Sequence, residues 1–105
     1  MQPNDVTSIV EVWAKSLPVP VMVFLFGSFL KGGSENANDV DLAVVILKDM
    51  EPSDRTLFWM DNHSKWKKDL SEKIRKPVDL QLYEPGHSSQ LRKYLLEASK
   101  LIYAA

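Results

Sequence analysis

Residues 24–45 read FLFGSFLKGGSENANDVDLAVV, a polar, glycine-containing segment between two apolar runs. The first run, VMVFLF at residues 21–26, is continuously apolar, which is typical of a strand covered on both faces. The second, DVDLAVVIL at residues 39–47, is rich in branched residues and begins with two acids. The stretch therefore predicts two buried strands, with Asp39 and Asp41 where the second strand begins.

Length and composition indicate one domain spanning residues 1–105, with 45% hydrophobic residues to form its core. The net charge of −1 does not attract a nucleic-acid backbone, so direct binding of nucleic acid is not expected. The basic run KWKKDLSEKIRK, residues 65–76, mixes both signs of charge and is typical of a solvated helix face.

Features of the sequence favour a cytoplasmic protein. The chain contains no cysteine, which suits a reducing compartment. Its first residues, MQPNDVTSIVEVW, lack the basic and apolar regions of a signal peptide. No apolar run approaches the ~18 residues of a membrane helix, so no membrane association is expected.

Hydrophobic periodicity predicts two long helices. The first is expected to be capped by Asn4 or Asp5 and to end before the prolines at 18 and 20. The second is expected to start at Ser53 or Asp54 and to run to about Lys76. Their apolar stripes consist of Val6, Ile9, Val10, Trp13 and Leu17 in the first helix, and Trp59, His63, Trp66, Leu70 and Ile74 in the second.

The remaining segments complete an alternating order. A short helical turn is expected over Ser28–Lys31, a third strand over 78–83, and a last helix whose stripe includes Ile102. The predicted order is helix, strand, short helix, strand, helix, strand, helix. It indicates an α/β (α+β) fold with a small mixed three-stranded sheet flanked by helices. The short connection between the first two strands permits a crossover or an antiparallel return.

Three aspartates form the candidate metal site. Asp39 and Asp41 are expected on one face of the second strand, about 7 Å apart, because side chains alternate at roughly 3.3 Å per residue. Asp79 is the second residue of the third strand and is expected on its polar face. If the two strands are neighbours, the three carboxylates meet, and their repulsion favours a bound cation. Oxygen ligands suit Mg²⁺ or Mn²⁺.

The residues after the first strand suit a phosphate group. Gly27 lets the backbone turn, and Ser28 then offers a hydroxyl and free N–H groups at the start of a helical turn. Lys31, one turn later, is either a phosphate contact or a solvated surface lysine. A metal site beside such a turn is what phosphoryl or nucleotidyl transfer requires.

These motifs together resemble a known family. Gly27-Ser28, ten intervening residues and Asp39-Val40-Asp41 are similar to the signature of the DNA polymerase beta-like nucleotidyltransferase superfamily, and Asp79 matches its third carboxylate. The resemblance covers nearly the whole chain and extends to the element order of the minimal nucleotidyltransferases. Leu30 departs from the small residue often found there, whereas Lys31-Gly32 keeps the next part of the pattern.

The resemblance implies an activity and roles for the residues. It implies two magnesium ions and transfer of a nucleoside monophosphate, with AMP from ATP expected, to a hydroxyl acceptor with release of pyrophosphate. Gly27 and Ser28 would hold the triphosphate. Asp39 and Asp41 would bind both metals. Asp79 would bind the catalytic metal or help to deprotonate the acceptor.

The resemblance also implies a partner. Minimal members are commonly encoded beside helical HEPN proteins and form toxin–antitoxin pairs with them, in which the nucleotidyltransferase binds the toxin or transfers AMP to it. Since the chain has no acceptor-binding domain, specificity is expected from a partner, from a second copy of the chain, or from a few loop residues. Leu96 and Tyr103, on the outer side of the predicted last helix, are either part of such a surface or ordinary exposed residues.

Two functions of different classes therefore remain open. One is an active magnesium-dependent nucleotidyltransferase, which the three carboxylates favour. The other is a binding protein that neutralises a helical HEPN partner by complex formation with weak or no catalysis, which the short chain leaves open.

Overall fold

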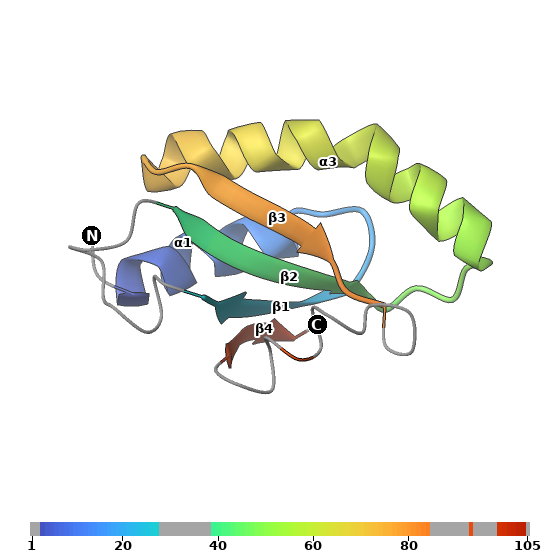
Figure 1. Cartoon of the computed structure of the whole chain (residues 1–105), viewed down its shortest axis with the longest axis horizontal. Coiled ribbons are helices and arrows are strands. Elements are labelled where there is room, and N and C mark those ends of the chain that lie inside the picture. The colour runs from blue at the N-terminus through green and yellow to red at the C-terminus, as the bar shows by residue number, and fades with distance from the viewer. Residues whose placement is uncertain (1–2, 28–38, 85–92, 94–98, 105) are drawn as a thin grey trace.

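The computed structural model describes residues 3–27, 39–84, 93 and 99–104 (Figure 1). Four strands lie side by side in one sheet, and α3 runs alongside it next to β3 (Figure 1). The elements are α1 (Pro3–Lys15), β1 (Val21–Phe26), β2 (Val40–Ile46), α3 (Pro52–Ile74), β3 (Val78–Leu82) and β4 (Ser99–Ala104).

The sheet is mixed, as the sequence predicts. Its strand order is β3-β2-β1-β4. β1 and β2 pair antiparallel, so the short connection between them is a return rather than a crossover. β2 and β3 pair parallel, and α3 provides the crossover that such a pair needs.

Both helices pack on the same face of the sheet. Trp13 of α1 and Trp66 of α3 meet edge to face, with ring centroids 6.0 Å apart. The apolar stripes of both helices lie toward this core, so the predicted helix faces are confirmed. The buried core residues of the helices and of β1–β3 are Val6, Val10, Trp13, Ala14, Val21, Val23, Leu25, Val40, Leu42, Val44, Ile46, Trp66, Leu70, Ile74, Val78 and Leu80.

The opposite face of the sheet carries a smaller apolar cluster. Phe26 and Ala43 are buried there, with Phe24 and Tyr83 packed against them. The central strands β1 and β2 are thus covered on both faces at these positions, which explains their nearly continuous apolar sequences.

The fourth strand is a correction to the predicted last helix. Residues 99–104 pair antiparallel with β1, so Ile102 and Tyr103 belong to a strand. A β-bulge lies between the pairs Val23–Tyr103 and Phe24–Leu101 and leaves Ile102 as the extra residue. Both Ile102 and Tyr103 consequently reach the helix-covered core, and the predicted exposure of Tyr103 is wrong. Leu96 lies outside the described residues.

Two helix starts also differ from the expectation. α1 begins at Pro3, so Asn4 and Asp5 lie inside the helix rather than before it. The N-cap of α3 is Glu51, which makes no side-chain cap hydrogen bond, and Pro52 follows it with a φ that suits the start of a helix. The helix ends at Ile74, where Arg75 takes a left-handed conformation with φ 64° and its N–H donates to the Ser71 carbonyl.

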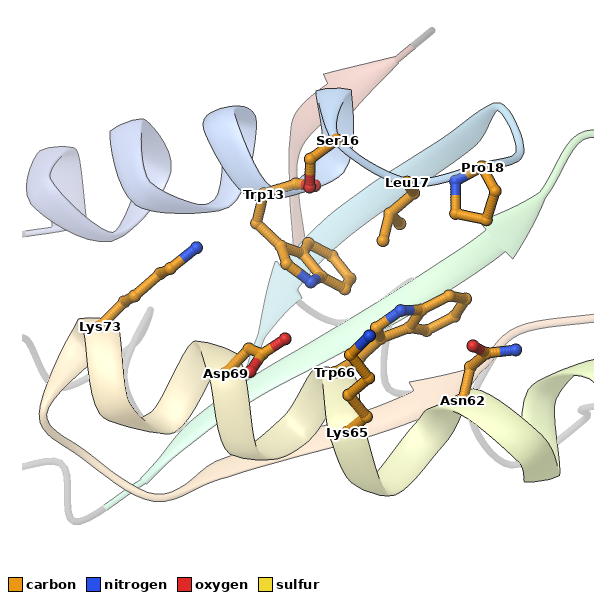
Figure 2. A pocket seen from close by; sticks show the side chains of 9 residues that line it. All are labelled: Trp13, Ser16, Leu17, Pro18, Asn62, Lys65, Trp66, Asp69 and Lys73. Atoms are coloured by element: carbon orange, nitrogen blue, oxygen red, sulfur yellow. The ribbon is translucent and has the colours of Figure 1, made fainter.

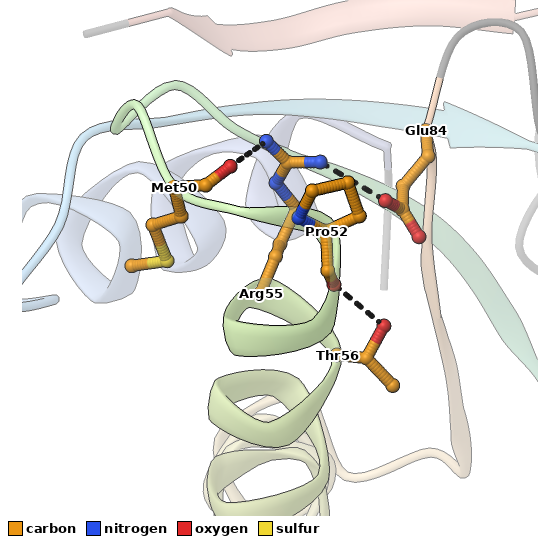
Figure 3. A network of polar contacts seen from close by, with 5 residues as sticks. All are labelled: Met50, Pro52, Arg55, Thr56 and Glu84. Carbon is orange, nitrogen blue, oxygen red and sulfur yellow. Dashed lines mark hydrogen bonds and ion pairs between the residues drawn. The ribbon is translucent and has the colours of Figure 1, made fainter.

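Polar contacts attach α3 to the sheet. Arg55 donates to the Glu84 carboxylate, which follows β3, and to the Met50 carbonyl, both at 3.0 Å (Figure 3). Farther along the helix, His63 donates from Nε2 to the Leu80 carbonyl of β3 at 2.9 Å. His63 is partly buried, which agrees with its place on the predicted apolar stripe of this helix. These contacts help to set the position of β3.

Some expectations fall outside this description. The predicted helical turn over Ser28–Lys31 and most of the last helix lie in segments that the structure does not describe. Within the described segments, no helix combines the length and the apolar character needed to cross a membrane.

The packing predicts that two leucines of α3 differ sharply in their importance. Leu70 is fully buried against the sheet, whereas Leu57 is 58% exposed. Leu70→Ala should lower the free energy of unfolding by about 3 kcal/mol, because it leaves a cavity in the core. The matched Leu57→Ala variant should change it by less than about 0.5 kcal/mol. Urea unfolding measures both, and equal losses would contradict the assignment of the core face.

Candidate active site

Strand pairing brings Asp41 and Asp79 side by side. In the parallel register of β2 and β3, Asp41 and Asp79 are direct partners. In the antiparallel register of β1 and β2, Asp41 also partners Phe26, the last residue of β1. The strand neighbours expected from the sequence are therefore present, and the two carboxylates occupy one level of the sheet.

The two aspartates share the face opposite the helices. Their chain neighbours Val40, Leu42 and Val78 are buried in the helix-side core, and alternation along a strand then places Asp41 and Asp79 on the other face. Both are half-buried. Asp39 lies just before β2 and is also half-buried.

Electrostatics show that the three acids interact. Burial raises the pKa of Asp41 from its ordinary value of 3.8 to about 6, with further contributions from the negative charges of Asp39 and then Asp79. Asp41 is thus the central group of the cluster, and it ionises at a higher pH than an ordinary aspartate does.

Asp79 has a specific polar neighbour on its own strand. The Gln81 side-chain amide donates from Nε2 to Oδ2 of Asp79 at 2.9 Å. The sequence places Gln81 on the same face as Asp79 through its two-residue spacing, but that spacing alone gives no sign of this bond.

The donor chemistry of this cluster fits a hard divalent cation, since all three groups offer carboxylate oxygens. The side chains do not yet converge on one point, however. Among residues 3–27, 39–84, 93 and 99–104, no three acidic, histidine or cysteine side chains already stand where they could hold one ion together. The three acids are nevertheless close enough to interact, since the charges of Asp39 and Asp79 both contribute to the raised pKa of Asp41.

Gly27 permits the close approach of Asp41 to the end of β1. Its φ of 79° lies in the left-handed region, which side chains rarely adopt. A Cβ atom built on Gly27 would collide with the Asp41 carboxylate and lie 3.0 Å from its Cγ. Only glycine suits this position, as the sequence predicts for the turn after β1. Ser28 and Lys31, the other predicted nucleotide contacts, lie outside the described residues.

The hollows between the helices are a different region. One has a volume of about 230 Å³ and is lined by residues of α1 and α3 such as Trp13, Trp66 and Asp69 (Figure 2). Another, of about 330 Å³, is lined by Ser8, Ile9, Val12 and Lys73. Both lie on the helix side of the sheet and include none of the three clustered aspartates, so we do not assign the reaction to them.

Comparisons with known proteins agree with the geometry. A family model described as "Polymerase beta, Nucleotidyltransferase" matches residues 8–105. A search of the curated proteins found no match.

Solved structures share the fold. A chain of a toxin–antitoxin complex with AMP-PNP superimposes with a TM-score of 0.68 at 18% identity, covering 94% of this chain and 73% of that one. A complex of tri-AMPylated Shewanella oneidensis HEPN toxin with MNT antitoxin gives 0.64 at 19% identity, covering 100% and 74%. The toxin–antitoxin complex MntA–HepT gives 0.62 at 17% identity, covering 99% and 74%. At these identities the likeness is one of fold.

The raised pKa of Asp41 predicts a pH effect on stability. The native state holds the Asp41 proton more tightly than the unfolded chain does. This group therefore makes the metal-free protein lose stability as pH rises from 3.8 to about 6. Asp41→Asn should remove that contribution, so its melting temperature in chelator should exceed that of the wild type by more at pH 7 than at pH 4.

The matched control is Asp49→Asn, an exposed aspartate beyond β2. Its difference from the wild type should stay the same at both pH values. A gain for Asp41→Asn that is equal at pH 4 and pH 7 would show that Asp41 titrates normally.

Contact between Gly27 and Asp41 predicts that substitutions at the two positions are coupled. Gly27→Ala should cost about 2 kcal/mol of stability, because it combines a positive φ with a collision against the carboxylate. In an Asp41→Ala background the collision is gone, and the cost should fall by at least about 0.5 kcal/mol. A double-mutant cycle by urea unfolding measures this. An equal cost in both backgrounds would rule out the contact.

Proposed function

The chain belongs to the polymerase beta nucleotidyltransferase family, and from this premise we propose that it transfers a nucleoside monophosphate, AMP from ATP, to a hydroxyl group of a partner protein. Pyrophosphate is the second product. The family model matches residues 8–105, a range that includes the four described strands, α3 and all of α1 except its first residues.

The observation that carries the proposal is the pairing of Asp41 with Asp79 at the end of β1, beside Gly27. Two acids held side by side by backbone pairing, with a third close enough to raise the pKa of Asp41, form an unfavourable arrangement without a cation. A site whose function needs divalent metal explains why such an arrangement would be kept.

We assign the residues as follows. Asp39 and Asp41 hold the metal ions, and Asp79 holds the catalytic ion or receives the acceptor proton. Gly27 and Ser28 hold the triphosphate, and Lys31 neutralises a phosphate oxygen. Bound Mg²⁺, or Mn²⁺, would supply charge neutralisation of the phosphates and a lowered pKa for the attacking hydroxyl. The chain itself contributes the positions of these groups.

The nature of the partner is proposed from the structural neighbours. One of them is a complex of a tri-AMPylated HEPN toxin with an MNT antitoxin, and another toxin–antitoxin structure contains AMP-PNP. We propose that this chain is likewise the antitoxin of a pair, that a helical HEPN protein accepts the AMP, and that the pair acts in the cytoplasm.

A second candidate function rests on a specific observation. Among the described residues, no three potential ligands already converge on one point. This arrangement also suits a protein of the same fold that neutralises its HEPN partner by binding it, with little or no transfer.

The two candidates are separated by a labelling experiment. The protein is incubated with α-labelled ATP, Mg²⁺ and the product of the neighbouring gene, and the partner is examined for label. Wild-type protein should label the partner. Asp41→Asn and Asp79→Asn should each reduce the rate at least about a hundred-fold, because each removes a proposed metal ligand. Asp49→Asn, outside the cluster, should label the partner at the wild-type rate.

The opposite results are equally informative. Absence of label with each of the four nucleoside triphosphates, in a pair that still forms a complex, would establish the binding protein instead. Labelling that survives Asp41→Asn would mean that the described carboxylates are not the active site.

A further inference from the structure

Gln81 contacts the candidate site without being one of its acids. Its amide Nε2 lies 2.9 Å from Oδ2 of Asp79. Both residues are on β3, two positions apart, so they project from the same face of the sheet. Alternate side chains on a strand are roughly 7 Å apart at their backbone, and the long glutamine side chain spans that separation.

The surroundings of Gln81 favour this geometry. Its partner residue on β2 is Ala43, a fully buried residue with a small side chain. Among the strands that the structure describes, β3 lies at the edge of the sheet, with β2 on one side. Within this described part of the chain, the contact that restrains the Asp79 carboxylate comes from Gln81, along the same strand.

We propose that Gln81 is a positioning residue for Asp79: its amide holds one carboxylate oxygen so that the other is presented to the metal-bearing site. This inference rests on the proposed function, since it assigns Asp79 a role toward a bound ion. Gln81 would thereby belong to the site without binding the ion, because its role is to orient the Asp79 carboxylate.

A neutral amide is well suited to orienting the Asp79 carboxylate. A lysine at the same place would also donate to Asp79, but its positive charge would compete with the cation for the carboxylate. An apolar side chain would leave Asp79 free to rotate away from its neighbours. The amide fixes orientation and leaves the negative charge of the cluster available.

The contact also distinguishes Asp79 from Asp41. The carboxylate of Asp41 is adjacent to the Gly27 backbone, and the charges of Asp39 and Asp79 contribute to its raised pKa. The orientation of Asp41 is thus restricted by the end of β1, while that of Asp79 depends on Gln81. Loss of Gln81 should consequently affect the ion and the step that Asp79 serves, and leave nucleotide binding near Gly27 largely intact.

Calorimetric titration of Mn²⁺ into the protein with AMP-PNP tests the inference. Gln81→Met, which has a similar length and no donor, should weaken Mn²⁺ affinity about ten-fold. The melting temperature of the metal-free protein should stay close to that of the wild type. In the labelling reaction, kcat should fall while KM for ATP stays within about two-fold, because Asp79 rather than the triphosphate contacts is disturbed.

Asn62→Met is the matched control. It also replaces an amide with methionine and removes one hydrogen bond, from Asn62 Nδ2 to the Phe58 carbonyl at 2.8 Å, but it lies on α3 rather than on the strands that carry Asp41 and Asp79. Its Mn²⁺ affinity and kcat should equal those of the wild type.

The possible results separate this inference from the function on which it rests. If the wild type binds Mn²⁺ with AMP-PNP and Gln81→Met binds it equally or more tightly, the positioning role is overturned and the proposed function stands. If the wild type itself binds no Mn²⁺ and labels no partner, the proposed metal-dependent function fails, and the role of Gln81 fails with it.

Discussion

The parallel pairing of β2 and β3 is the constraint on which the candidate site depends. Asp41 and Asp79 are partners only in the observed register, and a slip of one residue would turn Asp79 toward the helix-side core. That register is held by apolar packing on the other face, where Val40, Leu42, Val78 and Leu80 lie beneath the helices. The carboxylates are thus brought together by the hydrophobic core, against their own repulsion.

The site consequently has a cost that the rest of the molecule offsets. Burial and two neighbouring charges disfavour the ionised form of Asp41, and Gly27 holds a left-handed backbone conformation that leaves room for it. Unfavourable charge at the end of a sheet is expected where function, rather than stability, sets the local structure. A divalent cation would relieve the repulsion. Gln81 orients a carboxylate there without neutralising it.

The sequence predicts much of this arrangement because periodicity and local chemistry coincide in it. The stripe from Trp59 to Ile74 and the apolar runs of β1 and β2 correspond to observed elements. The two-residue spacing of Asp39 and Asp41 predicts a shared polar face, on which the structure places Asp41, whereas Asp39 lies just before β2. The sequence predicts a site only if β2 and β3 are neighbours, and it does not predict that pairing, since register depends on contacts between distant segments. The sequence does not predict the strand around Ile102, because its apolar residues also fit a helical stripe and neither the β-bulge nor the pairing with β1 has a local signal. The hydrogen bond from Gln81 was missed for a similar reason, as it needs the observed side-chain geometry.

The central claim is that Asp41 and Asp79 jointly form a metal site on the face opposite the helices. Anomalous diffraction from crystals grown with Mn²⁺ and AMP-PNP tests it most directly, because it locates the ion independently of catalysis. We predict a manganese peak about 2.1 Å from carboxylate oxygens of both Asp41 and Asp79. A nucleotide-bound manganese ion located elsewhere, such as in the hollow between α1 and α3, with both of these carboxylates unligated, would contradict the claim.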